Sequence, residues 1–118
     1  MKRIKVLLVE DDVFVQFVHK KLFESLNCEV VLAKNAMEAL DLDPQDYDYV
    51  FIDIGLPDIN GIELASMLRT VLKRSTRLFA LTAYTDLATK KACLDAGIDV
   101  VLHKPISAEK LQSVIGMS

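Results

Sequence analysis

Cysteine is scarce in this sequence and forms no recognisable motif. The two cysteines, Cys28 and Cys93, lie far apart and show no CxxC or Cys/His spacing. Such spacings are the usual sign of a zinc site or of a redox-active pair. We therefore expect two free thiols, as in a protein of the reducing cytoplasm.

The sequence also lacks a basic excess and a long apolar run. Its net charge is −3 and its pI is near 5.3, which gives no electrostatic footprint for nucleic acid or for an anionic membrane surface. No apolar run approaches the ~20 residues of a membrane-spanning helix. The first apolar run is short and ends in acids instead of a signal-peptide cleavage site. We expect a cytoplasmic domain that contacts neither nucleic acid nor membrane.

Motifs for nucleotide binding and for nucleophilic catalysis are missing as well. There is no GxGxxG and no GxxxxGK(S/T), so the sequence gives no support for binding a dinucleotide or a nucleoside triphosphate. No Ser/His or Cys/His pair is poised for catalysis. His19 falls within a predicted helix and His103 beside a predicted strand end, and we expect both to be exposed or neutral structural residues.

The chain does contain enough apolar material for one folded domain. Of its 118 residues, 52% are hydrophobic and 26% are charged, which is typical of a globular chain. This length predicts a single domain over residues 1–118. Five short apolar runs predict buried strands: Ile4–Val9, Glu29–Ala33, Tyr49–Ile52, Arg77–Thr82 and Asp99–His103.

Segments with helical periodicity separate these runs. The predicted helices are Val13–Leu26, a short helix capped by Asn35 and ending at Leu42, about Ile62–Leu72, Asp86–Ala96, and a last helix from the cap Ser107 to about Ile115. Strands that alternate with helices and are apolar throughout predict a parallel sheet. The predicted fold class is therefore α/β, with a doubly wound five-stranded parallel sheet and helices on both faces.

Polar side chains follow four of the five predicted strands. They are Glu10 and Asp11 after the first strand, Asp53 at the end of the central one, Thr82 at the fourth and Lys104 after the fifth. Because the carboxyl ends of parallel strands share one edge of a sheet, we expect these groups in one crevice. Clustered carboxylates raise one another's pKa unless a cation lies among them. Oxygen ligands without His or Cys favour Mg²⁺, with Mn²⁺ as an alternative.

A carboxylate beside a metal ion and a lysine, with a hydroxyl in reach, is a layout for accepting a phosphoryl group. Asp53 would be the acceptor, because it ends the central strand and a loop broken by Pro57 and Gly61 follows it. The metal ion and Lys104 would neutralise charge on the transferred group, since phosphoryl transfer depends mostly on positioning and electrostatics.

These positions together resemble the signature of receiver domains of two-component response regulators. The matching segments are Glu10-Asp11, Asp53 with Pro57 and Gly61, Thr82-Ala83 and Lys104-Pro105, in the family's order and spacing along the whole chain. The resemblance implies a flavodoxin-like fold and a role in signal transduction. It also implies a partner, a histidine kinase or a histidine-phosphotransfer domain, whose phosphohistidine supplies the phosphate.

The resemblance assigns a role to each residue of the crevice. It implies that Asp53 is the phosphoacceptor and a metal ligand, Asp11 a direct Mg²⁺ ligand, Glu10 a ligand through water, and Gly55 a ligand through its backbone carbonyl. Thr82 and Lys104 are implied to bind the phosphoryl group through a hydroxyl and an ammonium. The Lys104–Pro105 peptide bond is implied to be cis. Asp12 is expected to be a helix N-cap and to lie outside the site.

Two departures from the common pattern indicate a subset of the family. Val101 stands where receivers that drive an attached output domain usually have Tyr or Phe, and Gly55 replaces a larger residue. The phrases DIGLPD and VLHKPIS resemble receivers embedded in hybrid sensor histidine kinases. We therefore expect a phosphorelay role within such a kinase.

Two other functions remain open at this point. A Mg²⁺-dependent phosphohydrolase with an aspartyl-phosphate intermediate needs a second acid two residues after the nucleophile, where this chain has Gly55. A receiver-like domain that is never phosphorylated would act only in protein interaction. The intact set of Asp53, Thr82 and Lys104 argues against that second possibility.

The first predicted helix carries more apolar residues than contact with the sheet requires. One side of it, projected at about 100° per residue, is expected to cover the sheet and holds Phe14, Val15, Val18, Leu22 and Leu26. Val13 and Phe17 lie off that stripe, so we expect them to be partly exposed near the acidic edge. They predict a docking surface for a helical partner that carries the phosphodonor histidine.

Overall fold

The computed structural model describes residues 3–42, 47–84 and 86–115 of the chain. Strands and helices alternate along these residues, as the apolar runs predicted. The strands are short and mostly buried: β1 (Ile4–Val9), β2 (Cys28–Ala33), β3 (Tyr49–Asp53), β4 (Arg77–Thr82) and β5 (Val100–His103). Their aliphatic, β-branched and aromatic side chains suit a sheet that is covered on both faces.

Each helix begins after a polar residue that caps it. The helices are α1 (Val13–Ser25), α2 (Ala36–Asp41), α3 (Gly61–Arg69), α4 (Leu87–Asp95) and α5 (Ala108–Val114). Their caps, whose side chains each accept a hydrogen bond from an amide of the first turn, are Asp12, Asn35, Asn60, Asp86 and Ser107. The helix α3 ends three residues before the predicted Leu72, because residues 70–72 form a turn that bonds back to Met67 and Leu68.

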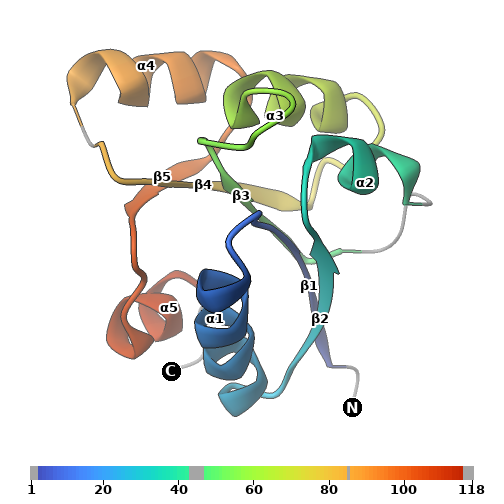
Figure 1. The fold of residues 1–118 in the computed structure, drawn as a ribbon, viewed down its shortest axis with the longest axis vertical. Coiled ribbons are helices and arrows are strands. Elements are labelled where there is room, and N and C mark those ends of the chain that lie inside the picture. The colour runs from blue at the N-terminus through green and yellow to red at the C-terminus, as the bar shows by residue number, and fades with distance from the viewer. Residues whose placement is uncertain (1–2, 43–46, 85, 116–118) are drawn as a thin grey trace.

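The five strands pair in parallel in the order β2-β1-β3-β4-β5. The pairs Val9 with Ile52, Asp53 with Leu81, and Thr82 with His103 fix the register across the middle of the sheet. Figure 1 shows α1 and α5 on one face of the sheet and α2, α3 and α4 on the other. This arrangement confirms the predicted doubly wound five-stranded parallel sheet.

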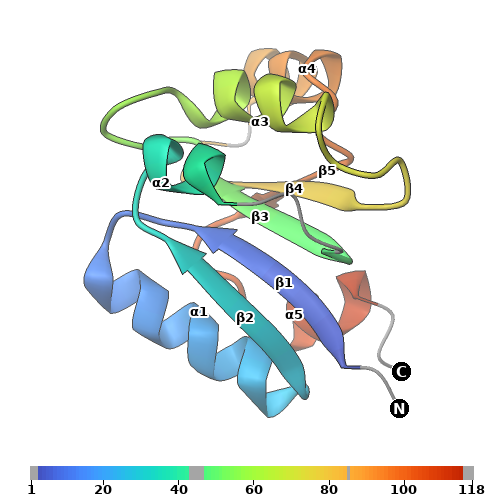
Figure 2. The same ribbon diagram turned by 90° about the vertical axis from the view of Figure 1, so that its right-hand side faces the viewer.

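Helices cover both faces of the sheet (Figures 1 and 2), and two apolar cores hold them there, one on each face. On the side of α1 and α5, the Phe51 ring stacks on Phe79 with centroids 4.5 Å apart and meets the edge of Phe23 at 4.9 Å. On the opposite side, Val50 and Ile52 pack with buried residues of α2 and α3. Both faces of β3 are therefore packed, so the strand that ends at Asp53 is held rigidly.

The predicted buried face of α1 was wrong in one respect. Phe14 is 69% exposed, whereas the residues that α1 buries are His19 and Phe23. The buried stripe is centred near His19, and Phe14 lies about 140° from it at 100° per residue. The prediction placed the stripe too near Val18, because it counted only apolar residues and so left out the buried His19.

Three further predictions concern a peptide bond, the cysteines and the lengths of the helices. The Lys104–Pro105 peptide bond is cis, which confirms the prediction. Cys28 and Cys93 are free and buried. Within the three described ranges, no helix combines the length and the apolar character that crossing a membrane would require.

Candidate functional site

The carboxyl ends of β1, β3, β4 and β5 meet at one edge of the sheet and surround a cleft. The cleft has a volume of about 420 Å³. Its lining includes every residue that the sequence predicted for the crevice: Glu10, Asp11, Asp53, Gly55, Thr82 and Lys104. Asp12, Asn60 and Tyr84 add further polar side chains, and Ile54 and Ala83 complete the wall. The parallel register therefore does bring these distant sequence positions together.

Three carboxylates lie close together in this cleft. One oxygen from each of Glu10, Asp11 and Asp53 can be chosen so that all three lie within 4.8 Å of one another. Glu10 is fully buried, Asp53 is 5% exposed and Asp11 is exposed. Carboxylates so placed repel one another unless positive charge lies between them.

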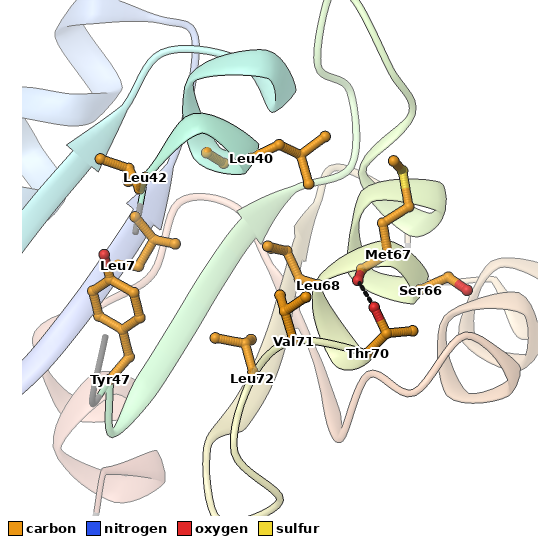
Figure 3. Close-up of a pocket in the computed structure, with 11 residues that line it drawn as sticks. Leu7, Leu40, Leu42, Tyr47, Ser66, Met67, Leu68, Thr70, Val71 and Leu72 are labelled. Atoms are coloured by element: carbon orange, nitrogen blue, oxygen red, sulfur yellow. Dashed lines mark hydrogen bonds between the residues drawn. The ribbon is translucent and has the colours of Figure 1, made fainter. Parts of the chain in front are cut away.

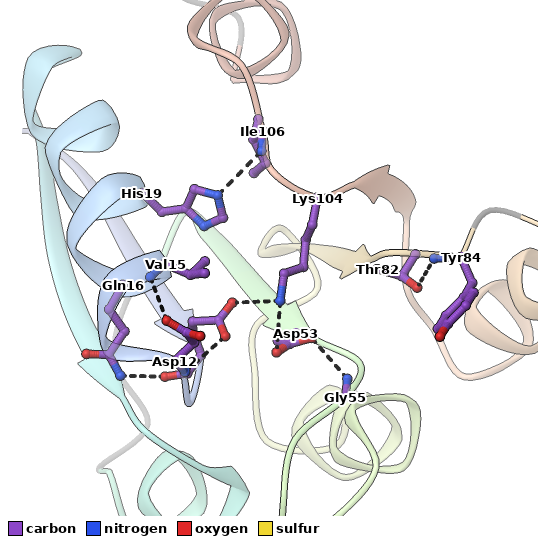
Figure 4. Close-up of polar contacts among 11 residues, drawn as sticks. Asp12, Val15, Gln16, His19, Asp53, Gly55, Thr82, Tyr84, Lys104 and Ile106 are labelled. Atoms are coloured by element: carbon purple, nitrogen blue, oxygen red, sulfur yellow. Dashed lines mark hydrogen bonds and ion pairs between the residues drawn. The ribbon is translucent and has the colours of Figure 1, made fainter.

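Lys104 supplies positive charge from the opposite side of the cleft (Figure 4). Its Nζ lies 3.2 Å from Asp53 Oδ2 and 3.3 Å from Glu10 Oε1. Burial acts to lower the pKa of Lys104, but the charges of Asp53 and Glu10 outweigh burial and raise this pKa. One ammonium thus contacts two of the three clustered carboxylates, and the cluster keeps an excess of negative charge.

The pKa of Glu10 is raised by its surroundings in this cluster. Burial raises the pKa of Glu10 to about 7; the hydrogen bond from the Asp12 amide lowers it, and the Asp53 charge raises it. Its Oε2 accepts that amide hydrogen bond at 3.2 Å, whereas Oε1 has the Lys104 ion pair but no hydrogen bond. A buried carboxylate oxygen without a hydrogen bond, next to two other acids, fits a hard cation that takes oxygen ligands.

The Asp53 side chain is held at both of its oxygens. Oδ2 faces Lys104, and Oδ1 accepts a hydrogen bond from the Gly55 amide at 3.0 Å. Gly55 is exposed in the cleft wall, and it leaves the space beside Asp53 open because it has no side chain. The predicted use of the Gly55 carbonyl as a metal ligand remains a prediction.

Thr82 closes the cleft on the β4 side. Its side chain is 4% exposed, and its hydroxyl oxygen accepts a hydrogen bond from the Tyr84 amide at 2.9 Å. The Thr82 backbone carbonyl accepts the Lys104 amide at 2.9 Å, which joins the ends of β4 and β5. The hydroxyl therefore faces the cleft from a fixed position and still has its own proton to donate.

Asp12 behaves as predicted for a helix cap. Its Oδ1 accepts a hydrogen bond from the Val15 amide at 3.0 Å at the start of α1 (Figure 4). That bond explains why an acid follows Asp11 in the sequence. Asp12 lines the cleft but is not part of the group of three carboxylates.

Two contacts made by the loop between β3 and α3 were not predicted from the sequence. A Cβ on Gly61 would overlap the Asp53 carbonyl oxygen and the Ile54 α-carbon, so only glycine fits where α3 begins. Asp58, in the loop after β3, accepts hydrogen bonds from the amides of Ala36 and Met37 at the start of α2. A glycine eight residues after an acid suggests a turn, but the sequence does not reveal which backbone it will touch.

His19 lies behind Lys104 on α1 and is 1% exposed. Its Nε2 accepts a hydrogen bond from the Ile106 amide at 3.4 Å (Figure 4). Burial lowers the pKa of His19, as does the Lys104 charge, while Asp53 opposes them. His19 is thus the neutral structural histidine that was one of the two expectations for it, and His103 is exposed.

An apolar hollow of about 360 Å³ between α1 and Lys104-Pro105 is lined by Phe14, Val15, Val18 and His19.

A second cavity, of about 520 Å³, lies away from the carboxylates between α2 and α3 (Figure 3). Among the residues that the structure describes, leucines, Val71 and Met67 make up most of its wall, and Tyr47 is the one titratable residue that lines it. The described part of this wall therefore has none of the charged groups that phosphoryl or metal chemistry requires.

Comparison with known proteins agrees with the geometry. Residues 6–116 match the model of the response regulator receiver domain. The chain belongs to this family. It is a receiver domain of two-component signalling, homologous to receivers in hybrid sensor histidine kinases.

Two relatives illustrate this homology. The chain is 38% identical over 109 residues to the autoinducer 2 sensor kinase/phosphatase LuxQ of Vibrio parahaemolyticus, a match that covers 92% of this chain and 13% of LuxQ. It is 31% identical over 119 residues to the osmosensing histidine protein kinase SLN1 of Saccharomyces cerevisiae, covering 95% of this chain and 10% of SLN1. The receiver thus spans roughly a tenth of the length of the curated relatives that it matches.

Solved structures have the same fold. The receiver domain of a sensor histidine kinase from Pseudomonas aeruginosa PAO1, which has a magnesium ion coordinated in its active-site cleft, has a TM-score of 0.85 and 28% identity. That match covers 98% of this chain and 97% of the other. A CheY-like receiver domain protein from Methanospirillum hungatei JF-1 has a TM-score of 0.88 and 26% identity, with 98% and 93% covered. The predicted flavodoxin-like fold is confirmed.

Proposed function

We propose that this receiver takes a phosphoryl group onto Asp53 in a Mg²⁺-dependent reaction, and that residues 1–118 form this one domain. The observation that carries the proposal is the nearly buried Asp53 carboxylate at the end of the central strand, with the Lys104 ammonium 3.2 Å from Oδ2. Two further acids beside it supply the remaining groups that a metal-assisted phosphoacceptor needs.

The residues of the cleft would hold the metal as a group. Asp11 and Asp53 would bind Mg²⁺ directly, Glu10 through a water molecule, and Gly55 through its backbone carbonyl, with Mn²⁺ as an alternative ion. The oxygen-only donor set and the Glu10 Oε1 atom without a hydrogen bond support this choice. The magnesium ion in the related Pseudomonas receiver supports it further. When bound, the cation would neutralise charge that develops on the transferred phosphoryl group.

The phosphoryl group would come from a phosphohistidine of a protein partner. A carboxylate oxygen of Asp53 attacks phosphorus, so that an O–P bond forms while the P–N bond breaks. The bonding electron pair stays on the imidazole nitrogen, and a ring that is protonated on its other nitrogen leaves as neutral imidazole. Asp53 becomes an acyl phosphate, and no other reactant is consumed.

Lys104 and Thr82 would stabilise the charge of the group being transferred. The Lys104 ammonium, already beside Asp53 Oδ2, would pair with a phosphoryl oxygen. Thr82, whose oxygen accepts from the Tyr84 amide, would donate its own proton to another phosphoryl oxygen. Both groups come from neighbouring strand ends, so little reorganisation is needed when the phosphoryl group arrives.

The donor would be a histidine kinase or a histidine-phosphotransfer domain, and the receiver would serve in the phosphorelay of a hybrid kinase. Val13 is 73% exposed and Phe17 is 61% exposed, at the end of α1 that borders the cleft. With the apolar hollow beside Lys104-Pro105, they form a surface suited to the apolar side of a helix that presents the phosphohistidine.

Intact-mass measurement with a small phosphodonor tests the proposal. The protein is incubated with Mg²⁺ and the donor, and its mass is followed over time beside a sample without metal. A phosphoacceptor gains the mass of one phosphoryl group only with Mg²⁺. A true phosphohydrolase would instead release phosphate catalytically with no lasting mass gain. An interaction domain would neither gain mass nor release phosphate. Catalytic phosphate release without a mass gain, or no reaction at all, would contradict the proposal.

A further inference from the structure

Asp58 connects two parts of the molecule that lie far apart in the sequence. It stands in the loop between β3 and α3, five residues after Asp53. Its Oδ1 accepts a hydrogen bond from the Ala36 amide at 3.0 Å, and its Oδ2 accepts one from the Met37 amide at 2.9 Å. Both donors belong to the first turn of α2. One exposed carboxylate therefore ties the loop after the phosphoacceptor strand to another helix.

Capping of α2 does not by itself explain this carboxylate. Asn35 already accepts the Glu38 amide at 2.8 Å, and Glu38 Oε1 accepts the Lys34 amide at 2.9 Å. These two bonds form a variant of the capping box within the helix's own segment, in which Glu38 accepts the amide of Lys34, the residue before the N-cap Asn35. Asp58 adds its two bonds from outside that segment. Slight burial acts to raise the pKa of Asp58, but the amides of Met37 and Ala36 outweigh burial and lower it, so the carboxylate remains charged at neutral pH.

The base of the same loop is built against Asp53. The Gly55 amide donates to Asp53 Oδ1 at 3.0 Å, and the Gly61 amide donates to the Ile54 carbonyl at 2.9 Å. Gly61 lies directly on the backbone of Asp53 and Ile54. The Gly61 end of the loop is thus fixed by backbone contacts, whereas Gly55 bonds to a side-chain oxygen of Asp53, and Pro57 and Asp58 at the outer part of the loop are exposed. The two bonds of Asp58 are what fasten that outer part to α2.

We propose that Asp58 is a positioning residue: by clamping the loop to α2, it holds the Gly55 backbone in the place that the Asp53 site needs. This inference rests on the proposed function, because Gly55 matters there both as the donor to Asp53 and as the predicted carbonyl ligand of the metal. Asp58 does not line the cleft, so its influence passes through the loop alone. Residues that orient a metal ligand without touching the metal commonly change affinity by about tenfold or more when replaced.

The test compares Asp58→Ala with Asn35→Ala. Both variants remove a side-chain cap from the N-terminus of α2, but only Asp58→Ala releases the loop. In the metal-free protein, the amide resonance and the hydrogen exchange of Gly55 are measured by NMR. Affinity for Mg²⁺ alone is then measured by calorimetry. We expect Asp58→Ala to shift and deprotect the Gly55 amide and to weaken Mg²⁺ binding about tenfold. Asn35→Ala should loosen α2 but leave the Gly55 amide resonance unshifted. Its Gly55 exchange rate and its Mg²⁺ affinity should stay within twofold of the wild-type values.

The outcomes separate this inference from the proposed function. Equal effects of the two variants, or an unchanged Gly55 amide in Asp58→Ala, would overturn the positioning role. Asp58→Asn retains one carbonyl acceptor, so it should give an intermediate Gly55 shift, and it serves if Asp58→Ala does not fold. If the wild type bound no Mg²⁺ or took no phosphate, the proposed function would fail. The metal-free Gly55 amide would still decide whether Asp58 positions the loop.

Discussion

The Nζ atom of Lys104 lies 3.3 Å from Oε1 of Glu10, and this ion pair joins the end of β1 to the segment after β5 across the ends of β3 and β4. Glu10 is fully buried, while the Lys104 side chain is 23% exposed. The pair therefore connects the interior of the sheet edge with the open cleft. Its charge balance underlies the first two predictions.

Replacing Lys104 should slow phosphorylation of Asp53 without unfolding the domain. Lys104→Ala removes the cation that offsets three carboxylates, so the metal-free variant should be less stable than the wild type, and Mg²⁺ should restore most of the loss. Phosphorylation from a small donor, measured by intact mass, should be slower. Lys110→Ala, at an exposed site on α5, is the control. A large loss of thermal stability that persists in Mg²⁺ would instead mean that Lys104 is structural.

The raised pKa of Glu10 predicts how stability depends on pH. Because the folded pKa of about 7 exceeds the ordinary glutamate value of 4.5, the folded state holds this proton more tightly than the unfolded state does. The stabilisation is complete below pH 4.5 and is lost as the pH rises towards 7. It amounts to about 3 kcal/mol for a difference of this size.

Glu10→Gln should remove this pH dependence. The lowered pKa of His19 makes the protein less stable as the pH falls below the ordinary histidine value of 6.5, which is opposite to the effect of Glu10. The difference in the free energy of unfolding between wild type and Glu10→Gln isolates the contribution of Glu10. It is obtained from urea unfolding at several pH values without metal. The wild type should lose stability relative to Glu10→Gln between pH 5 and pH 7. Parallel curves would show that Glu10 does not titrate in this range.

The close approach of Gly61 to Asp53 predicts a sharp contrast between two glycines. A Cβ on Gly61 would overlap backbone atoms, so Gly61→Ala should destabilise the fold by about 1–3 kcal/mol and displace the end of β3. In Gly55→Ala the new Cβ would lie 3.7 Å from Asp53 Oδ1, which is an ordinary contact. Urea unfolding of both variants measures the difference. Equal stability of the two would contradict the packing described for Gly61.

The exposed apolar residues of α1 predict dependence on the protein donor. Phe17→Ser should slow phosphate uptake from a phosphohistidine partner and leave uptake from a small donor unchanged, because Phe17 lies outside the cleft. Leu94→Ser, at a site that is 56% exposed on α4, is the matched control and should change neither rate. Equal loss with both donors, or no loss with either, would rule out docking through Phe17.

Much of the fold could be predicted because its signals are local. Apolar runs such as Ile4–Val9 marked the strands, and Asn35 and Ser107 marked helix starts. The cluster at the sheet edge followed from the parallel topology, since it requires only that strands end on the same side.

The errors and omissions concern tertiary contacts. The buried face of α1 was misplaced because His19, a polar residue, packs behind Lys104 and bonds to the Ile106 amide. The clamp by Asp58 depends on where α2 lies relative to a loop more than twenty residues away along the chain. No local pattern around Asp58 encodes that distance.

Mapping the phosphorylated residue tests the central claim most directly. The wild type and Asp53→Asn are incubated with Mg²⁺ and a small phosphodonor, and each is then examined by intact mass and by mass spectrometry of its peptides. We expect one phosphoryl group on the peptide that contains Asp53, and no mass gain in Asp53→Asn or in wild type from which Mg²⁺ has been removed. Acid-stable phosphate on serine or threonine, or labelling that persists in Asp53→Asn, would contradict Asp53 as the phosphoacceptor.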